Sequence, residues 1–344
     1  MSAQLVRWGV LGAASINAAV VPALQQAERS SVIGLASRTL SKAQAAAREF
    51  GIPRTYDGYA ALLADDEIDA VYIPLPNHLH FPWTLHAIRA GKHVLCEKPI
   101  AVTALEAAEM CREARGAGVR LAEAFMYAHH PRYERIRAIL GSGEIGDVRA
   151  IISTFTFDAS DEMDSALFQG YPGSGSLYDV GCYPIHAARY LLSREPDAVT
   201  LHAQMSTDHG NIDMLASGLL EFPGDVSVLF QSGLWAEERN TLEVLGSRGK
   251  IDVPSAFICT PGDGDFFVTV AGSSRRVAAP YANHYVSQAT RFVDAILDGS
   301  ELLYDAQDPI KNMAVIDACY RSLHLKERVP IATVTNMQPI PAGH

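Results

Sequence analysis

Two distant stretches of the chain carry side chains that together could move a proton. Lys98 follows an apolar run with only Glu97 between them, and Tyr183 lies much further along, four residues after Asp179. Tyrosine alone is a weak base with an ordinary pKa near ~10, but a nearby ammonium group lowers that pKa by favouring the phenolate. Lys98 and Tyr183 therefore suit the proton transfer that accompanies hydride transfer at a carbonyl or hydroxyl carbon. Taken singly, Lys98 also fits an ordinary surface turn, and Tyr183 an aromatic side chain at the core's edge.

The stretch around Tyr183 has a helical spacing of polar groups. Asp179, Tyr183 and His186 stand at i, i+4 and i+7, so they would share one face of a continuous helix. The glycine-rich residues 173–176 ahead of them predict a flexible lead into the start of that helix.

A glycine turn near the N-terminus has features of a pyrophosphate site. Such a site needs a tight turn, a close approach of backbone, and a helix N-terminus with free N–H groups. Read as GxGxxG from Gly12, the motif has Ala14 and Asn17 in place of the second and third glycines, and Asn17 weakens the match. A glycine turn between any strand and helix remains the alternative. The expected cofactor contacts in this turn are Gly12, Ala13, Ala14, Ser15 and Ile16.

The end of the second apolar run indicates which dinucleotide is bound. NAD enzymes usually place Asp or Glu there for the ribose 2′-hydroxyl, but this chain has Ser37 and Arg38. Arg38 could pair with a 2′-phosphate, Ser37 could donate a hydrogen bond, and Lys42 could add charge. The sequence therefore favours NADP, with NAD possible; an ordinary solvated arginine is the alternative.

The next strand ends complete the expected cofactor site. Ends of parallel strands near the chain reversal are where ligands bind. His78 and His80 resemble a metal pair, but no carboxylate or cysteine stands nearby at ligand spacing, so a packing or cofactor-lining role is favoured and no metal is expected. The further expected cofactor contacts are Pro74, Leu75, Asn77, His80, Glu97 and Lys98.

Apolar runs and helical patterns alternate through the first part of the chain. A T-x-x-E capping box at Thr103 and Glu106 precedes one of these helices. Alternating strands and helices indicate a parallel sheet with helices on both faces, so we expect an α/β, doubly wound Rossmann domain over residues 1–125. The expected strands are 6–11, 31–36, 68–73, 93–96 and 119–124, and the expected helices 16–27, 42–50, 81–90 and 103–116.

The pattern changes in the remaining residues, 126–344. Strands in series without intervening helices favour an open, largely antiparallel sheet, so this part is expected to be a second α/β domain for substrate binding and oligomerisation. The expected strands are 148–157, 198–205, 216–222, 226–234, 241–245, 250–253 and 266–270, and the expected helices 132–140, 184–192, 285–297 and 309–325.

Composition excludes several other classes. A net charge of −11 argues against general nucleic-acid binding, which needs a basic surface. No stretch reaches the ~18–20 apolar residues of a membrane span, and the N-terminus lacks the pattern of a signal peptide. The five cysteines are scattered without CxxC, which predicts reduced thiols in a cytoplasmic protein.

Four segments carry a resemblance to a known family. VYIPLPNHLH, GKHVLCEKP, EAFMY and GSLYDVGCYPIHAARYLL resemble the Gfo/Idh/MocA oxidoreductases, above all the branch with dimeric dihydrodiol dehydrogenase and NADP-dependent D-xylose dehydrogenase. The resemblance implies that Lys98 is the catalytic lysine, that Tyr183 is the general acid/base, and that Asp179 orients a substrate hydroxyl. Relatives often read M-Y-R-F-H-P, whereas residues 126–131 here lack this arginine, a group that often lines the substrate entrance of the family. The candidate substrate contacts are Tyr127, Phe157, Asp179, Tyr183 and Trp235, with His284 as a further aromatic ring.

We therefore expect an NADP(H)-dependent dehydrogenase or reductase that acts on a secondary alcohol or hemiacetal carbon of a sugar, polyol or diol. A hydrolase or epimerase that recycles a tightly bound dinucleotide, and a non-catalytic NADP sensor, are the alternatives. The open second sheet predicts a homodimer or homotetramer, since exposed apolar faces mark interfaces.

Overall fold

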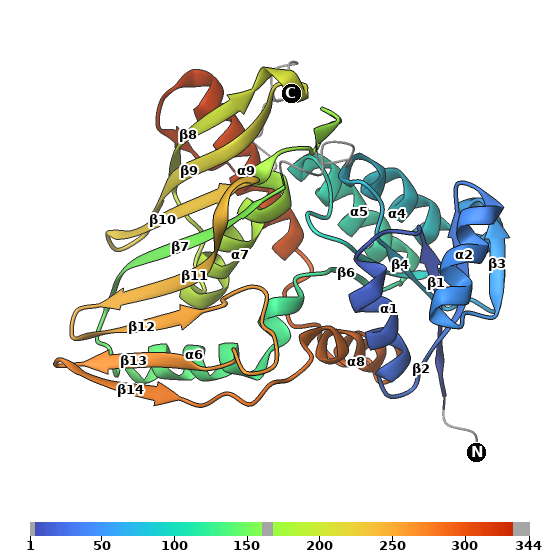
Figure 1. The fold of residues 1–344 in the computed structure, drawn as a ribbon, viewed down its shortest axis with the longest axis horizontal. Helices are drawn as coiled ribbons and strands as arrows, with labels where there is room; N and C mark the ends of the chain where they lie inside the picture. Colours follow the sequence, from blue (N-terminus) through green and yellow to red (C-terminus); the bar gives the residue numbers. More distant parts are fainter. Residues whose placement is uncertain (1–3, 160–167, 333–344) are drawn as a thin grey trace. The chain divides into compact units, whose positions relative to one another are not determined.

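The computed structural model describes residues 4–159 and 168–332, which form two compact units (Figure 1). Among the described residues, one unit joins residues 4–129 with 283–310, and the other joins 130–159, 168–282 and 311–332. This division differs from the expected boundary after residue 125, because residues 283–310 return to the first unit. The ring of Phe292 lies 5.5 Å from that of Trp8 and belongs to the same apolar core.

The first unit contains the expected doubly wound parallel sheet. Among the described residues it has six strands in the order β3-β2-β1-β4-β5-β6. The order in which strands are added to the sheet therefore reverses between β1 and β4. Ligands of such sheets bind at the carboxyl ends of the strands beside that reversal. Its strands are β1 (Val6–Leu11), β2 (Ser30–Ser37), β3 (Arg54–Asp57), β4 (Ala70–Ile73), β5 (His93–Cys96) and β6 (Leu121–Glu123).

Helices connect these strands, and one later helix joins them. The capping box is present: the Thr103 hydroxyl accepts a hydrogen bond from the Glu106 N–H (3.2 Å), and the Glu106 carboxylate accepts one from the Val102 N–H (2.9 Å). The short, partly exposed β3 and α3 were not expected, because their sequences lack a clear apolar period. The helices are α1 (Asn17–Gln26), α2 (Leu40–Phe50), α3 (Tyr59–Leu63), α4 (His80–Arg89), α5 (Ala104–Ala117) and α8 (His284–Leu297).

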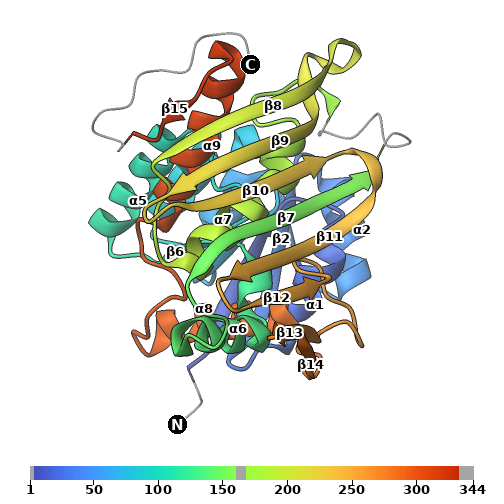
Figure 2. The ribbon, with the colours of Figure 1, turned by 90° about the vertical axis from the view of Figure 1, so that its left-hand side faces the viewer.

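The second unit is built on the expected open sheet. Within the part of the chain that the structure describes, nine strands follow the order β14-β13-β12-β11-β7-β10-β9-β8-β15, and β7 and β10 are the parallel neighbours. Figure 2 shows the face of this sheet that carries no described helix. The strands are β7 (Val148–Asp158), β8 (Ala198–Ser206), β9 (Ile212–Phe222), β10 (Val226–Gly233), β11 (Trp235–Gly246), β12 (Gly249–Pro254), β13 (Phe266–Val270), β14 (Ser273–Val277) and β15 (Val329–Pro330).

The other face of this sheet is packed against helices. α7 (Cys182–Leu192) contacts β7 and β10, and α9 (Asp308–Leu325) is bonded to β8, where the Ser322 hydroxyl accepts from the Leu201 N–H (3.0 Å). α6 (Pro131–Ser142) carries the fully buried Arg132, whose guanidinium donates to the Ala256 carbonyl (2.6 Å). None of the helices described here is long and apolar enough to cross a bilayer.

Candidate functional site

The turn after β1 is shaped for an anionic group. Gly12 has φ +134°, a left-handed value that favours glycine, and a Cβ there would lie 3.1 Å from Leu75 Cδ2. The backbone N–H groups of Ala13–Ile16 donate to no residue of the described chain, and α1 starts directly after them. Free amides at a helix N-terminus are the groups that bind a pyrophosphate.

Asn17 explains how the turn keeps its shape without the third glycine. Its side chain is 1% exposed, and its amide donates a 2.8 Å hydrogen bond to the Gly12 carbonyl. The departure from the glycine fingerprint is therefore compensated by a bond that closes the turn from inside.

Two cations stand free at the end of β2. Leu11 pairs with Ala36, so β2 ends beside the glycine turn. Arg38 and Lys42 are exposed, and neither has an acidic partner within residues 4–159 and 168–332. Ser37 is 4% exposed. This edge therefore presents positive charge without the carboxylate that an NAD site usually carries.

His80 bridges the loops that follow β4 and β5. Its ring is fully buried, with Nδ1 2.7 Å from the Pro99 carbonyl oxygen and Nε2 2.7 Å from the Leu75 carbonyl oxygen. Burial lowers the pKa of His80 to about 4, although the two carbonyls act in the opposite direction. The neutral ring has one N–H, so it donates to one of these two carbonyls, and a direct contact of His80 with a cofactor stays a prediction.

The loop with Lys98 is also held at its two ends. The Tyr72 hydroxyl donates to Glu97 Oε1 (2.7 Å), and Glu97 Oε2 accepts from the Lys98 N–H (3.3 Å). Beyond Lys98, the buried Glu123 carboxylate accepts from the Ile100 N–H (2.8 Å). Lys98 itself is half-buried, and its peptide bond to the following proline is cis.

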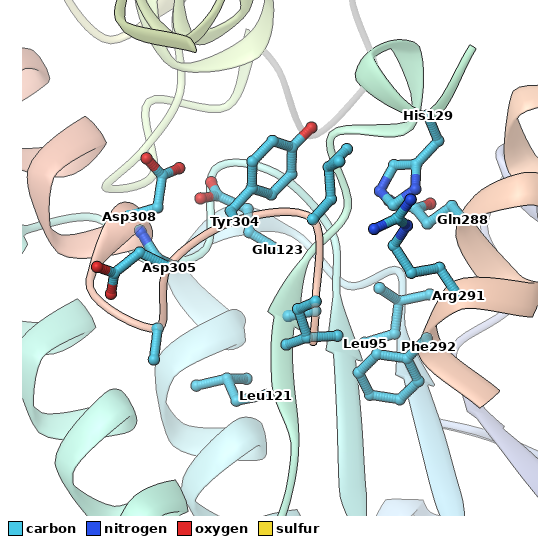
Figure 3. A pocket seen from close by; sticks show the side chains of 15 residues that line it. Leu95, Leu121, Glu123, His129, Gln288, Arg291, Phe292, Tyr304, Asp305 and Asp308 are labelled. Atoms are coloured by element: carbon cyan, nitrogen blue, oxygen red, sulfur yellow. The ribbon is translucent and has the colours of Figure 1, made fainter. Parts of the chain in front are cut away.

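A cavity lies next to β6 (Figure 3). Figure 3 shows Gln288 and Arg291 of α8 facing the loop that carries Tyr304 and Asp305. Its lining contains none of the site residues expected from the sequence, although Glu123 belongs both to its wall and to the contacts of the Lys98 loop. The cavity is therefore separate from the expected cofactor contacts.

Asp179 and Tyr183 lie on one continuous helical segment of the second unit. Residues Leu177–Gly181 form a π-helical turn that runs directly into α7. Asp179 is half-buried within the wide turn, and Tyr183 is 5% exposed in the first turn of α7. His186 is fully buried, and its ring stacks on that of Tyr190 with centroids 6.1 Å apart, so it belongs to the core. π-Turns occur frequently at functional sites.

Two aromatic residues missed by the sequence analysis surround Tyr183. Its ring lies 5.3 Å from that of Phe155 and 5.5 Å from that of Phe257, while those two rings stack on each other at 5.3 Å. The alternation along β7 could have identified Phe155, because it stands on the same face as the predicted Phe157. Phe257 follows β12 in a loop, where no periodic pattern identifies it.

The other expected substrate contacts differ in their exposure. Phe157 is half-buried, and Trp235 is 40% exposed at the start of β11. Tyr127 is 1% exposed and meets Phe125 edge-on, with centroids 6.3 Å apart, so its ring offers almost no free surface. His284 is buried against Tyr285, with ring centroids 4.7 Å apart.

Metal-ligating side chains do not gather in the described part of the chain. No group of three or more His, Cys, Asp or Glu side chains there could hold a metal ion. All five cysteines are buried and unpaired by disulfides, and burial raises the pKa of the Cys111 thiol to about 12.

Comparison with known proteins identifies both halves of the chain. Residues 6–125 match a family model described as the oxidoreductase family with an NAD-binding Rossmann fold. Residues 133–252 match one described as the GFO/IDH/MocA C-terminal domain.

Three similar proteins illustrate the match. An uncharacterized oxidoreductase of Rhizobium meliloti is 41% identical, over 93% of this chain and 97% of its own length. D-xylose 1-dehydrogenase (NADP(+)) 2 of Haloferax volcanii is 37% identical, over 92% of this chain and 96% of its own length. The crystal structure of a 3-ketoreductase from Actinomadura kijaniata with NADP and TDP-benzene is 29% identical, covers 93% of this chain and 98% of that chain, and has a TM-score of 0.88.

Proposed function

We propose that this chain, which belongs to the GFO/IDH/MocA family of oxidoreductases, transfers a hydride between NADP(H) and a secondary alcohol or hemiacetal carbon of a sugar or related polyol. The observation that carries the proposal is the edge of the parallel sheet. There, the free amides after Gly12 lie beside the end of β2, which carries the exposed Arg38. Leu75 meets the same turn and is joined through His80 to the loop that presents Lys98.

The residues at this edge fit NADP(H). The amides of Ala13–Ile16 suit the pyrophosphate, and Arg38 and Lys42 suit a 2′-phosphate. When bound, the nicotinamide of NADP(H) supplies or accepts the hydride. Pro74 and Leu75 would form one wall of the site, because Leu75 already meets the Gly12 turn.

Proton movement is assigned to Lys98 and Tyr183. The Lys98 ammonium stabilises the phenolate form of Tyr183 and polarises the reacting oxygen, so Tyr183 accepts or donates the proton near neutral pH. Asp179 holds a neighbouring hydroxyl of the substrate through a hydrogen bond to its carboxylate. Phe155 and Phe257 keep water from one side of the Tyr183 ring, which strengthens the electrostatic effect of the ammonium.

The substrate class follows from similar proteins and not from this chain's own pocket. They include a D-xylose 1-dehydrogenase and a reductase of a dTDP-linked dideoxyglucose. A turnover screen of aldoses, ketoses, inositols, anhydrosugars and vicinal diols, each with NADP and NAD, identifies the substrate. Free NADPH accumulating in proportion to product separates the dehydrogenase from a hydrolase or epimerase that recycles a bound dinucleotide.

Lys98→Met tests the assignment of the catalytic lysine. We expect kcat to fall by about 10³-fold while fluorescence titration shows that the variant still binds NADPH. Exposed Lys326→Met is the matched control and keeps wild-type kcat. A folded Lys98→Met protein that binds NADPH and turns over at the wild-type rate contradicts the proposal.

We further propose a cytoplasmic homodimer or homotetramer that associates through the uncovered sheet face (Figure 2). Ile152 and Leu229 are 39% and 50% exposed on adjacent strands of that face. Light scattering after size exclusion should give a mass of two or four chains, and a 37.2 kDa species alone would contradict this assembly. Leu229→Glu should shift the assembly towards monomer.

A further inference from the structure

Asp213, near the start of β9, is a buried carboxylate that the proposed reaction does not use. It is 1% exposed. Its Oδ2 accepts hydrogen bonds from the Ser176 hydroxyl (2.8 Å) and the Leu177 N–H (2.7 Å), and its Oδ1 accepts one from the Tyr320 hydroxyl (2.8 Å). Leu177 is the first residue of the π-helical turn that leads to Asp179. One carboxylate therefore joins β9, α9 and the start of the turn.

The glycine-rich stretch before the turn is shaped around this carboxylate. Gly175 has φ +108°, and a Cβ there would overlap Asp213 Oδ1. Ser176 is fully buried and also lies 3.1 Å from the Ser232 hydroxyl. The sequence analysis expected residues 173–176 to be a flexible lead. At Gly175 the missing side chain instead permits the close approach of Asp213.

Tyr320 reinforces the same junction from α9. Besides its bond to Asp213, its ring stacks on Tyr178 of the π-turn, with centroids 4.9 Å apart and planes 26° from parallel. Both Asp213 and Tyr320 thus hold the turn by directional contacts, which fix its orientation as well as its position.

We propose that Asp213 is a positioning residue, whose carboxylate sets the direction in which the segment presents Asp179 and Tyr183. The inference rests on the proposed function for those two side chains. They follow Leu177 on one continuous helical segment, so a tilt at its start moves both together. A misplacement of about 1 Å in a catalytic group can cost on the order of 10²-fold in rate.

Asp213→Asn tests this role because it keeps the side-chain shape while its amide cannot accept from all three donors. We expect hydrogen–deuterium exchange to increase in residues 175–185, kcat to fall by roughly 10- to 100-fold, and NADPH affinity to stay unchanged. Ser176→Ala should give a smaller loss that is not additive with Asp213→Asn. Ser322→Ala is the matched control, since it removes buried hydrogen bonds on α9 that do not involve the turn.

Each outcome bears on one proposal. Wild-type kcat and unchanged exchange in Asp213→Asn, or an equal kcat loss in Ser322→Ala, would overturn the positioning role. An increase in exchange at 175–185, in a protein whose wild type turns over no substrate of the panel, supports the anchor and counts against the proposed function. If Asp213→Asn does not fold, Tyr320→Phe removes one donor only and should lower kcat in the same direction.

Discussion

The segments that carry Lys98 and Tyr183 are both held by buried titratable side chains, but the two anchors have opposite acid–base character. On the Lys98 side, His80 joins the Pro99 and Leu75 carbonyls, and burial lowers the pKa of this histidine to about 4. On the Tyr183 side, Asp213 accepts from hydroxyl and N–H donors, and burial raises the pKa of this carboxyl. One segment is thus held by an imidazole that meets carbonyl oxygens, and the other by a carboxylate that accepts from hydroxyl and N–H groups.

The difference follows from the backbone groups that each segment leaves without a partner. In the loops after β4 and β5, the groups that meet the anchor are the carbonyl oxygens of Leu75 and Pro99. The anchor, His80, therefore has to supply an N–H. The start of a helical segment leaves N–H groups, so the anchor at Leu177 has to accept. The local secondary structure therefore dictates the chemistry of the residue that supports each catalytic side chain.

The largest expected effect tests whether the two segments serve one reaction step. Tyr183→Phe removes the proton-transferring hydroxyl and should lower kcat by about 10²- to 10⁴-fold. If Lys98 acts through Tyr183, Lys98→Met combined with Tyr183→Phe should lose no more than the worse single variant, because groups that act as a unit are not additive. Steady-state kinetics with NADPH and the substrate found by the screen measure all three variants.

Tyr190→Phe on the same helix is the control for loss of a hydroxyl, and it should retain nearly full kcat. Losses that multiply in the double variant would mean that Lys98 and Tyr183 act independently. The comparison between their two anchors would then have no catalytic meaning.

The sequence predicted the elements better than the contacts that hold the site. Strong apolar periods identified β1, β5 and β13 with their correct bounds, since buried strands need continuous or alternating apolar residues. Residues 283–310, which the sequence analysis assigned to the second domain, lie in the first compact unit, because an amphipathic helix does not specify which sheet it covers. Helix α8 packs on the first unit through Phe292, whose ring contacts that of Trp8, a residue far away in the sequence.

The candidate site shows the same limit. Lys98 and Tyr183 were recognisable because their motifs are local, whereas Asp213 carries no motif and is recruited through non-local hydrogen bonds. His80 was identified as a residue of the cofactor edge, but a sequence does not show that its buried ring lies between the Pro99 and Leu75 carbonyls.

The second effect concerns pH and separates the anchors directly. His80 has a pKa of about 4 in the folded protein against an ordinary value of 6.5, so the unfolded chain binds its proton first as pH falls. His80 is therefore neutral at neutral pH and donates its single N–H to one of the two carbonyls. Its stabilising contribution is complete above pH 6.5 and is lost towards pH 4, by about 3 kcal/mol. His80→Gln should flatten this acid loss in urea unfolding at several pH values, while exposed His202→Gln should not.

Asp213 has the opposite sign. Because burial raises its pKa, its contribution is most favourable below the ordinary value of 3.8 and declines as pH rises. Asp213→Asn should therefore unfold with a smaller decline of stability as pH rises above 3.8. The variant should also be less stable at every pH, because it loses hydrogen bonds. If both variants change the same side of the pH profile, the contrast between the two anchors is wrong.

The smallest effect tests whether the two units divide cofactor and substrate recognition. Arg38→Ala removes one charged partner of a 2′-phosphate, so the KM for NADPH should rise by roughly tenfold, the KM for NADH should change little, and the KM for the sugar should stay constant. Asp179→Asn should do the reverse, raising the KM for the sugar while leaving NADPH binding intact. Exposed Arg112→Ala, on the outer surface of α5, controls for loss of surface charge. An Arg38→Ala enzyme that still prefers NADPH to NADH by the wild-type ratio would place 2′-phosphate recognition elsewhere, and cofactor choice would then not reside at the end of β2.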